Sequence, residues 1–550
     1  MQNLVEIRDL KVEATTDSGR RVEIIKGVNL DIAPGEIVAL IGESGSGKTT
    51  IALTLLGYAR AGCRISGGNV RIAGKDMVTL SERDRAAIRG TEVAYVPQSA
   101  AAAFNPAKRI IDQVIEVTRI HRLMPAHEAR QKAIGLFRAL SLPNPETIGS
   151  RYPHQVSGGQ LQRLSAAMAL ISDPKLVIFD EPTTALDVTT QIEVLRAFKS
   201  VMKKGGISGI YVSHDLAVVA QIADRIVVLR NGEVQEIGTT ADILTRAQHP
   251  YTRALLAAFE PQPRGGEILV KDRKVLLEVK DLVAGYGAKH RDGLPLIRAV
   301  DEVSLSVEKG RNLGIIGESG CGKSTLARAI AGILPASSGT IIFENRELPS
   351  AVRQRSRDQL REMQIVFQYA DTALNPEKSI EEILGRPLTF YHGMRGKQRE
   401  ARVGQLLDMV HLPNSLRHRR PQELSGGQKQ RVNFARALAA EPKLIICDEI
   451  TSALDTVVAA AIIDLLKELQ RELLLSYIFI SHDLSVVEAV CDEIVVMYGG
   501  RKVEEITPAH LQAPQHPYSK LLFSSVPKLD PGWLDALELD PELVRSYSKS

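Results

Sequence analysis

The sequence contains few cysteines, and they are scattered. Only four of the 550 residues are cysteine, and no two of them form a CxxC pair. Zinc sites, iron–sulphur clusters and disulfide frameworks are built from closely placed cysteines, so the spacing argues against all three. A reducing cytoplasm fits this composition best.

Long apolar runs and an excess of one charge are also lacking. No apolar run approaches the roughly 18 residues that a membrane helix needs. The N-terminal stretch MQNLVEIRDLKVE alternates polar and apolar residues, which favours a strand over a signal peptide. The net charge is only +4, from 69 basic and 65 acidic residues, so composition gives no sign of a nucleic-acid partner. If the protein works at a membrane, another subunit must span it.

An internal repeat dominates the sequence. GESGSGKTT at residues 42–50 returns as GESGCGKST at residues 317–325, and later motifs recur in the same order at nearly the same offset. A chain of 550 residues exceeds what one hydrophobic core usually organises, and a repeat this long indicates a duplicated domain. The predicted organisation is a first domain over 1–260, a linker over 261–275, a second domain over 276–528 and a C-terminal tail over 529–550.

Each copy alternates short buried strands with helical patterns. The runs EIVALIG, LVIFDE and GIYVSHD are rich in branched apolar residues and predict strands of a largely buried sheet. Segments 106–143 and 376–413 are charged and predict a helical insertion in each copy. Asn231-Gly232 and Gly499-Gly500 predict hairpin turns between late strands. The sequence therefore predicts α/β domains with a glycine-rich loop between a strand and a helix.

Both glycine-rich stretches match the pattern GxxxxGK[ST]. Glycines let the backbone wrap around phosphate oxygens, the helix N-terminus favours negative charge, and the lysine reaches the β and γ phosphates of ATP. The hydroxyl of Thr49 or Ser324 is expected to hold Mg²⁺. The predicted nucleotide-binding residues of the two loops are Gly42, Glu43, Ser44, Gly45, Ser46, Gly47, Lys48, Thr49, Thr50, Gly317, Glu318, Ser319, Gly320, Cys321, Gly322, Lys323, Ser324 and Thr325.

One apolar strand in each copy ends in an Asp-Glu pair. These pairs are Asp180-Glu181 in KLVIFDEP and Asp448-Glu449 in KLIICDEI. We expect the aspartates to support Mg²⁺ and the glutamates to polarise the water that attacks the γ phosphate. An isolated Asp-Glu pair is usually just a solvated strand end. Its place after a phosphate loop, in both copies, favours the catalytic interpretation.

The stretches VSGGQLQR and LSGGQKQR resemble the signature motif of ATP-binding cassette (ABC) proteins. The resemblance extends to Gln98 in YVPQ, Gln368 in IVFQ and the ALD motifs at 185–187 and 453–455. It covers nearly the whole chain. It implies two tandem P-loop nucleotide-binding domains, each with a RecA-like core, an antiparallel β subdomain and a helical subdomain.

The resemblance also implies two composite ATP sites. In this family, cassettes pack head to tail, so that one cassette grips the phosphates and the signature of the other caps them. His214 and His482 in the SHD motifs are then expected to contact the γ phosphate and to act with Glu181 and Glu449 in catalysis. Gln98 and Gln368 are expected to contact nucleotide and Mg²⁺. The signature residues that should cap the opposite sites are Ser157, Gly158, Gly159, Gln160, Ser425, Gly426, Gly427 and Gln428.

The two copies differ where the family usually stacks an aromatic ring on adenine. Tyr286 in LVAGYG stands at this position in the second copy, whereas the aligned residue of the first copy is Ala14. We therefore expect weaker adenine binding at the first phosphate loop, by about 1 kcal/mol, the scale of aromatic pair interactions. Cys321, inside the second loop, is either a site of thiol modification or, as we favour, a neutral filler.

Further local motifs are similar to those of the dipeptide, oligopeptide, nickel and opine importer ATPases. FNP at 104–106 and LNP at 374–376 follow the glutamine loops, and HPY recurs at 249–251 and 516–518. The fused arrangement looks like the double-cassette members of that group. This resemblance implies an ATPase bound peripherally to the cytoplasmic face of the cell membrane. Its implied partners are two integral-membrane permease subunits and an extracytoplasmic solute-binding protein.

The sequence also bears on an alternative function, on the C-terminal tail and on an iron–sulphur cluster. A soluble twin-cassette factor acting on ribosomes or nucleic acid is disfavoured by the modest net charge and the absence of a long basic arm between the copies. The tail with Trp533, the only tryptophan, is either a docking helix or a loosely packed segment. Many peptide-importer ATPases carry a cysteine-rich C-terminal segment, and since none is found here we expect no iron–sulphur cluster.

Overall fold

The chain divides into two compact units in the computed structural model. Unit 1 comprises Met1–Phe259 and Ser525–Ser550, and unit 2 comprises Glu260–Ser524. Within these units, the structure describes residues 3–15, 19–183, 186–259, 274–289, 291, 293–452, 454–511, 513–538 and 540–547. Most of the predicted linker, 261–273, lies outside the described residues.

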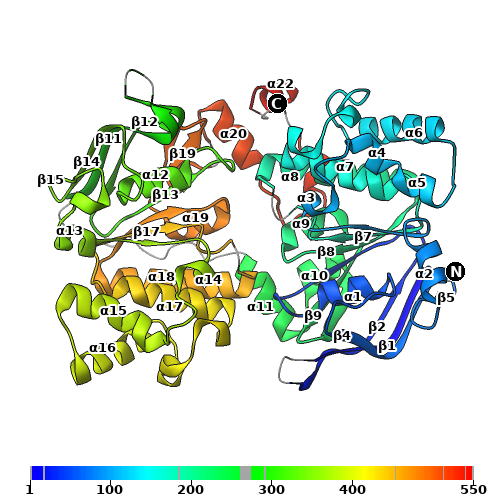
Figure 1. Cartoon of the computed structure of the whole chain (residues 1–550), viewed down its shortest axis with the longest axis horizontal. Coiled ribbons are helices and arrows are strands. Elements are labelled where there is room, and N and C mark those ends of the chain that lie inside the picture. The colour runs from blue at the N-terminus through cyan, green and yellow to red at the C-terminus, as the bar shows by residue number, and fades with distance from the viewer. Residues whose placement is uncertain are drawn as a thin grey trace. The chain divides into compact units, whose positions relative to one another are not determined.

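Unit 1 is built on two sheets (Figure 1). The central sheet has six strands in the order β10-β9-β3-β8-β7-β6, all parallel except for the β9–β10 hairpin. The other sheet is antiparallel, in the order β2-β1-β4-β5. The strands are β1 (Val5–Thr15), β2 (Arg21–Ile32), β3 (Ile37–Ile41), β4 (Cys63–Ile72), β5 (Lys75–Asp76), β6 (Val93–Val96), β7 (Leu176–Asp180), β8 (Ser208–Val212), β9 (Arg225–Arg230) and β10 (Glu233–Thr239).

The helices of unit 1 fall into a group beside the sheets and a separate helical region. The segment predicted as a helical insertion contains α4, α5 and α6; α4 and α6 pack against α7, and α5 packs against α4 and α6. The helices are α1 (Lys48–Thr54), α2 (Glu82–Ile88), α3 (Ala100–Ala103), α4 (Ile110–Val114), α5 (Glu116–Ile120), α6 (Ala126–Ala139), α7 (Gly158–Leu170), α8 (Val188–Gly205), α9 (Leu216–Ile222), α10 (Thr240–Arg246), α11 (Pro250–Phe259), α21 (Trp533–Ala536) and α22 (Pro541–Tyr547).

Unit 2 repeats this architecture, with a parallel sheet in the order β16-β17-β18-β13-β19-β20, closed by the antiparallel β19–β20 hairpin, and an antiparallel sheet β12-β11-β14-β15. Its strands are β11 (Val275–Lys289), β12 (Pro295–Glu308), β13 (Asn312–Ile316), β14 (Ser338–Phe343), β15 (Arg346–Glu347), β16 (Met363–Val366), β17 (Leu444–Asp448), β18 (Ser476–Ile480), β19 (Glu493–Tyr498) and β20 (Arg501–Ile506). Its helices are α12 (Lys323–Ile330), α13 (Arg357–Glu362), α14 (Ala370–Ala373), α15 (Ile380–His392), α16 (Gly396–Met409), α17 (Gly426–Leu438), α18 (Thr456–Leu473), α19 (Leu484–Val490) and α20 (Pro517–Ser524).

The core of each unit lies between its two sheets. In unit 1, Ile7 and Val12 of β1 are fully buried in one hydrophobic cluster with Leu40 of β3 and Leu176 of β7. The strands β3, β7 and β8 are buried along their whole length, because helices and the second sheet cover both faces. Burying each such side chain contributes roughly 1.5–3 kcal/mol. The α/β fold predicted from the apolar runs is confirmed.

The C-terminal segment of the chain packs on α8 and α9 of unit 1. Leu534 is 2% exposed. The side-chain amide of Gln221 donates to the carbonyl of Lys528 at 2.6 Å and accepts from the Leu534 backbone at 2.9 Å. Lys199 forms an ion pair with Asp535 at 2.8 Å. The segment after unit 2 in sequence therefore contributes to the core of unit 1.

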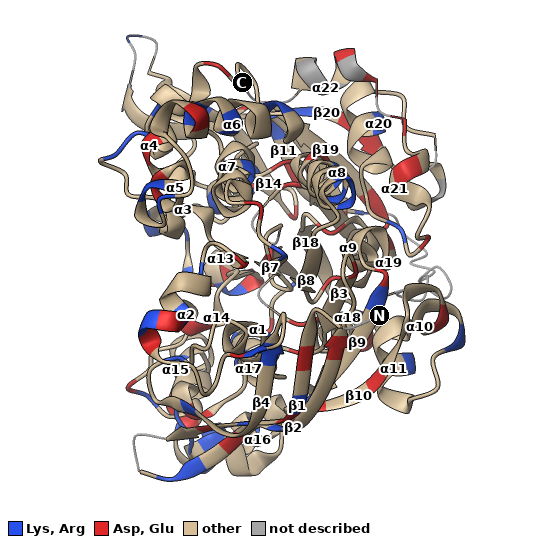
Figure 2. Ribbon diagram, turned by 90° about the vertical axis from the view of Figure 1, so that its right-hand side faces the viewer, with Lys and Arg blue, Asp and Glu red and all other residues tan. Residues whose placement is uncertain are grey.

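Charged residues of both signs are mixed along the surface elements. Figure 2 shows acidic and basic positions side by side on α2, where Glu82 and Asp84 share a short helix with Arg85. Across the described part of the chain, none of the helices has the length and apolar character that a membrane crossing requires.

Candidate active site

The glycine-rich loops connect a buried central strand to a helix in both units. Gly42 and Gly317 have φ values of 146° and 147°, which favour glycine. A Cβ on Gly42 would lie 2.0 Å from the carbonyl oxygen of Leu229, and one on Gly317 would lie 2.2 Å from that of Met497. Glycine at these positions therefore lets each loop pass close to the neighbouring strand, in a backbone conformation suited to binding phosphate.

The lysine of each loop is buried and held by the loop itself. Lys48 Nζ donates to the carbonyl oxygens of the first two loop residues at 2.8 and 2.9 Å. Lys323 Nζ makes the same two bonds at 2.7 and 2.9 Å. The ammonium group of each lysine therefore lies against two main-chain carbonyls at the start of a helix. A helix N-terminus and a lysine both favour a bound anion.

A hydroxyl–carboxylate pair joins each loop to the end of a neighbouring strand. Thr49 Oγ1 donates to Asp180 Oδ1 at 2.8 Å, and Ser324 Oγ donates to Asp448 Oδ1 at 2.8 Å. The pKa of Asp448 is raised, chiefly by burial and also by the negative charge of Glu449. The hydrogen bond from Ser324 lowers this pKa but does not cancel the increase. A bound cation would offset the cost of keeping such a carboxylate ionised.

These oxygen donors fit Mg²⁺. Mg²⁺ usually takes one or two protein oxygens together with substrate phosphates and water, and dedicated protein cages for it are uncommon. Within the described ranges, no group of three or more histidine, cysteine, aspartate or glutamate residues could hold a metal ion. A hydroxyl and one carboxylate beside a phosphate loop match the first arrangement.

The glutamate after each aspartate bonds the glutamine from the adjacent strand end. Gln98 Nε2 donates to Glu181 Oε2 at 3.1 Å, and Gln368 Nε2 donates to Glu449 Oε2 at 2.8 Å. Both glutamates have a left-handed backbone, with φ values of 48° and 49°. Non-glycine residues adopt this conformation at a cost and concentrate at functional sites. Gln368 also donates to Ser452 Oγ at 3.2 Å.

The predicted histidines differ between the units. His214 Nδ1 lies 3.4 Å from Glu181 Oε2. Burial lowers the pKa of His214, but its hydrogen bond to Glu181 and the charge of that carboxylate outweigh burial and raise the pKa above its ordinary value. In the described part of unit 2, His482 makes no hydrogen bond or ion pair with Glu449. The structure thus joins glutamine, glutamate and histidine in unit 1, and only glutamine and glutamate in unit 2.

Tyr95 was not foreseen at this site. Its hydroxyl donates to Asp180 Oδ2 at 2.8 Å, so both oxygens of this carboxylate accept a hydrogen bond. Burial and the neighbouring Asp180 raise the pKa of Tyr95, which keeps the hydroxyl protonated. The corresponding strand position in unit 2 is Ile365. Only the first copy has a hydroxyl at this position, so a comparison of the two copies of the repeat does not single out Tyr95.

The signature motifs form the N-termini of α7 and α17. Ser157 and Gln160 form a capping box, and Ser425 and Gln428 form its equivalent. A Cβ on the second glycine of the first signature would lie 2.0 Å from Thr190 Cγ2 of α8. The serine and the second glycine therefore have local structural roles. Ser157, Gly158, Ser425 and Gly426 are exposed, whereas Gly159 and Gln160 are buried.

The expected adenine-stacking residue of unit 2 lies near its phosphate loop. Tyr286 of β11 is 42% exposed, and its hydroxyl lies 3.4 Å from Thr325 Oγ1. Ala14 of β1 has only a methyl group and pairs with Val22 and Cys63. Ala185 and Ala453 of the predicted ALD motifs lie outside the described residues.

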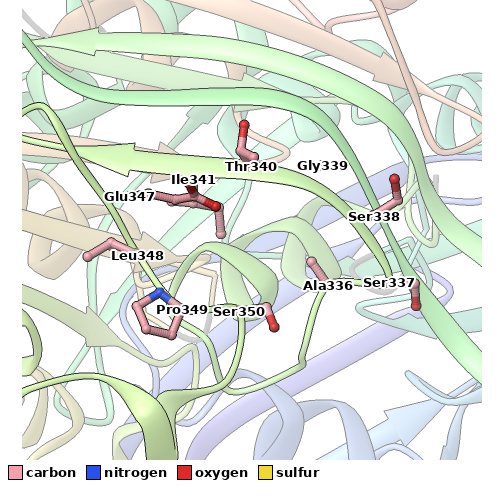
Figure 3. Close-up of a pocket in the computed structure, with 10 residues that line it drawn as sticks. All are labelled: Ala336, Ser337, Ser338, Gly339, Thr340, Ile341, Glu347, Leu348, Pro349 and Ser350. Carbon is pink, nitrogen blue, oxygen red and sulfur yellow. The ribbon is translucent and has the colours of Figure 1, made fainter.

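A pocket of 240 Å³ lies elsewhere in unit 2 (Figure 3). It is formed by β14, β15 and adjoining turns, and its lining consists of Ala336, Ser337, Ser338, Gly339, Thr340, Ile341, Glu347, Leu348, Pro349 and Ser350. No residue of the phosphate loop or the Asp-Glu pair lines it. It is separate from the candidate active site.

Two family models match the chain. The ABC transporter model matches residues 25–184 and 300–452. The model for the oligopeptide/dipeptide transporter C-terminal region matches residues 235–281 and 504–549, which include both HPY motifs. Both models occur twice, as the internal repeat requires.

Full-length relatives show the same fused plan. The peptidoglycan transport ATP-binding protein YejF of Agrobacterium fabrum is 38% identical over 95% of this chain and 96% of its own length. The glutathione import ATP-binding protein GsiA of Escherichia coli O157:H7 is 37% identical over 96% of this chain and 90% of its own. Among solved structures, cbiO1 of Clostridium perfringens is 31% identical and covers 44% of this chain and 92% of its own, with a TM-score of 0.39.

Proposed function

The chain belongs to the ABC transporter family as a double-cassette ATPase subunit, and on this premise we propose how its two cassettes work together. We infer two composite ATP sites. In the first, the loop of Lys48 faces the signature 425–428, and in the second, the loop of Lys323 faces the signature 157–160. The observation that supports one hydrolytic half-site per cassette is the repeated geometry within each unit, a hydroxyl–aspartate contact of 2.8 Å beside a glutamine–glutamate contact. The head-to-tail pairing is carried over from the ABC family.

The residues of each site have distinct tasks in hydrolysis. The lysine and the loop amides bind the β and γ phosphates. Thr49, Gln98 and Asp180 in the first site, and Ser324, Gln368 and Asp448 in the second, would hold Mg²⁺. When bound, this ion neutralises negative charge on the phosphates. Because Asp180 and Asp448 are assigned to Mg²⁺, the glutamates that follow them, Glu181 and Glu449, are the residues proposed to orient the attacking water.

The histidine of each site is proposed to orient the attacked phosphate. In the first site, Glu181 accepts a proton from water as oxygen attacks phosphorus, and the bond from the γ phosphorus to the leaving oxygen of ADP breaks. His214 holds Glu181 through the 3.4 Å contact and presents a donor to the transferred phosphate. His482 is proposed to act in the second site once nucleotide is bound.

We propose that hydrolysis drives solute import through membrane partners. The partners are two integral-membrane permease subunits, with a solute-binding protein acting through them, and this chain binds the cytoplasmic face. The two named relatives handle glutathione and peptidoglycan, and both names describe molecules with peptide character. Short peptide-like solutes are therefore the proposed cargo. The boundaries at 260, 275 and 528 remain predictions.

The double variant Glu181→Gln and Glu449→Gln tests this proposal. Glutamine keeps the shape but accepts no proton, so we expect hydrolysis to fall about 100-fold or more while ATP still binds. Phosphate release and nucleotide binding should be measured on the same preparation, with uptake measured in cells. Wild-type hydrolysis in the double variant would remove both glutamates from this role.

A further inference from the structure

A tyrosine from the C-terminal region of each cassette contacts the phosphate loop. Tyr251 lies in the first turn of α11, and its hydroxyl oxygen accepts from the backbone N–H of Glu43 at 3.3 Å. Tyr518 of α20 makes the same contact with the N–H of Glu318 at 2.9 Å. The two tyrosines are 5% and 0% exposed. They are the last residues of the HPY motifs.

A carboxylate on the preceding strand fixes the start of each tyrosine helix. In unit 1, the carboxylate of Glu236 accepts from the backbone N–H groups of Gln248 at 2.8 Å and His249 at 3.1 Å. His249 Nδ1 then accepts from the N–H of Tyr251 at 3.2 Å. The histidine and tyrosine of the motif are therefore connected by hydrogen bonds to β10.

Unit 2 contains the same connections. The carboxylate of Glu504 accepts from the N–H groups of Gln515 at 2.7 Å and His516 at 3.2 Å. His516 Nδ1 accepts from the N–H of Tyr518 at 3.2 Å. The surroundings of the rings differ, since Arg230 lies 4.7 Å above the Tyr251 ring whereas Tyr498 lies 4.6 Å from the Tyr518 ring. The contact with the loop is retained despite different packing.

We propose that Tyr251 and Tyr518 are positioning residues for the phosphate loops. Each hydroxyl occupies the N–H of the second loop residue and so holds the loop where its first two carbonyls bind Lys48 or Lys323. The helix that carries the HPY motif thereby sets the shape of the ATP phosphate site. This inference rests on the proposed function, in which these loops bind ATP phosphates.

The chemistry of the hydroxyl suits a fixed contact. Burial, followed by the charge of Glu43, raises the pKa of Tyr251 to about 12, so the hydroxyl stays protonated at neutral pH. It can therefore accept from the main-chain N–H and donate at the same time. A loop that is held before nucleotide arrives loses less conformational freedom on binding.

Tyrosine-to-phenylalanine variants test the proposal in the full chain. Tyr251→Phe is made in a Lys323→Ala background, so that nucleotide binding reports the first loop. Tyr518→Phe is made in a Lys48→Ala background to report the second loop. Phenylalanine retains the ring and its packing, and only the hydroxyl is lost. Loss of one hydrogen bond should weaken binding of MgATP about fivefold, and binding of inorganic tripolyphosphate by the same factor.

Steady-state kinetics separate positioning from simple stability. In the otherwise wild-type chain, both phenylalanine variants should raise KM for ATP about fivefold with kcat and the thermal midpoint nearly unchanged. Tyr58→Phe, which removes an exposed hydroxyl, is the matched control and should behave as wild type. A lowered thermal midpoint with unchanged affinity for both phosphates would overturn the inference.

The lysine backgrounds distinguish the two proposals. If Lys48→Ala and Lys323→Ala leave ATP binding unchanged, the loops are not phosphate sites and the proposed function fails. If the lysine variants weaken binding but the phenylalanine variants keep wild-type affinity and KM, only the positioning role of the tyrosines fails.

Discussion

The two cassettes share a fold but stabilise their reactive carboxylates differently. In unit 1, Asp180 accepts from both Thr49 and Tyr95, and Glu181 contacts both Gln98 and His214. In unit 2, an isoleucine replaces the tyrosine, and within the described residues Glu449 has no histidine contact. The first cassette has more contacts around its Asp-Glu pair, while the second has Tyr286, the residue predicted to stack on adenine. The duplication has therefore produced two cassettes whose candidate sites differ in their hydrogen-bond contacts.

The largest predicted effect compares single substitutions of Glu181 and Glu449, the two glutamates proposed to be catalytic. Because Glu181 has the complete network, we expect Glu181→Gln to remove most of the steady-state hydrolysis and Glu449→Gln to remove the smaller share. Phosphate release per chain at saturating ATP measures both variants. The exposed Glu400→Gln on α16 is the control. If each single variant halves the rate, the two sites contribute equally and the comparison fails.

The second prediction concerns the C-terminal segment, which belongs to unit 1. Leu534→Ala should lower the free energy of unfolding by about 2–3 kcal/mol, because it leaves a cavity against α8 and α9. Hydrogen exchange should show lost protection in α8 and α9 of unit 1, although Leu534 follows unit 2 in sequence. Leu473→Ala, at a 43% exposed position on α18, should cost less than about 0.5 kcal/mol. Unchanged protection in unit 1 would contradict the packing.

The third prediction exchanges the aromatic residue between the sites. Tyr286→Ala should weaken ATP binding at the second loop by about 1 kcal/mol, or roughly fivefold, through loss of stacking on adenine. Ala14→Tyr should strengthen binding at the first loop by a similar factor. Titration of ATP against variants with the other loop lysine replaced measures each site. If neither substitution changes the affinity for ATP, these positions do not stack on adenine.

Local patterns in the sequence predicted the fold and many site contacts. The apolar runs became buried strands, Asn231-Gly232 and Gly499-Gly500 became the turns between paired late strands, and the segments after Pro106 and Pro376 became helical. Each of these outcomes depends on residues close in sequence, where periodicity and turn chemistry act directly. The sequence assigned Thr49 with Asp180, and Ser324 with Asp448, to a shared Mg²⁺ site, and the structure places each pair in hydrogen-bond contact.

The contacts that sequence did not reveal join residues far apart in the chain. Tyr251 reaches Glu43, and Leu534 packs on a helix near Gln221, through tertiary packing that no local pattern specifies. The HPY motif is visible in the sequence as a repeated feature, but its spacing does not predict that its tyrosine contacts the phosphate loop. Tyr95 was hidden for another reason, since a repeat highlights what the copies share and this residue is where they differ.

The smallest predicted effect is a pH dependence that separates the two histidines. Glu181 raises the pKa of His214, so their contact stabilises the fold fully below the ordinary histidine pKa of about 6.5 and ceases to do so as the pH rises through the raised value. The difference in unfolding free energy between wild type and His214→Gln should therefore shrink from pH 5.5 to about pH 9. His482→Gln is the matched comparison, and denaturant unfolding across this range measures both. If the two variants show the same pH dependence, the Glu181–His214 pair does not distinguish the cassettes. If only His214→Gln shows it, the unequal network is present before nucleotide binds.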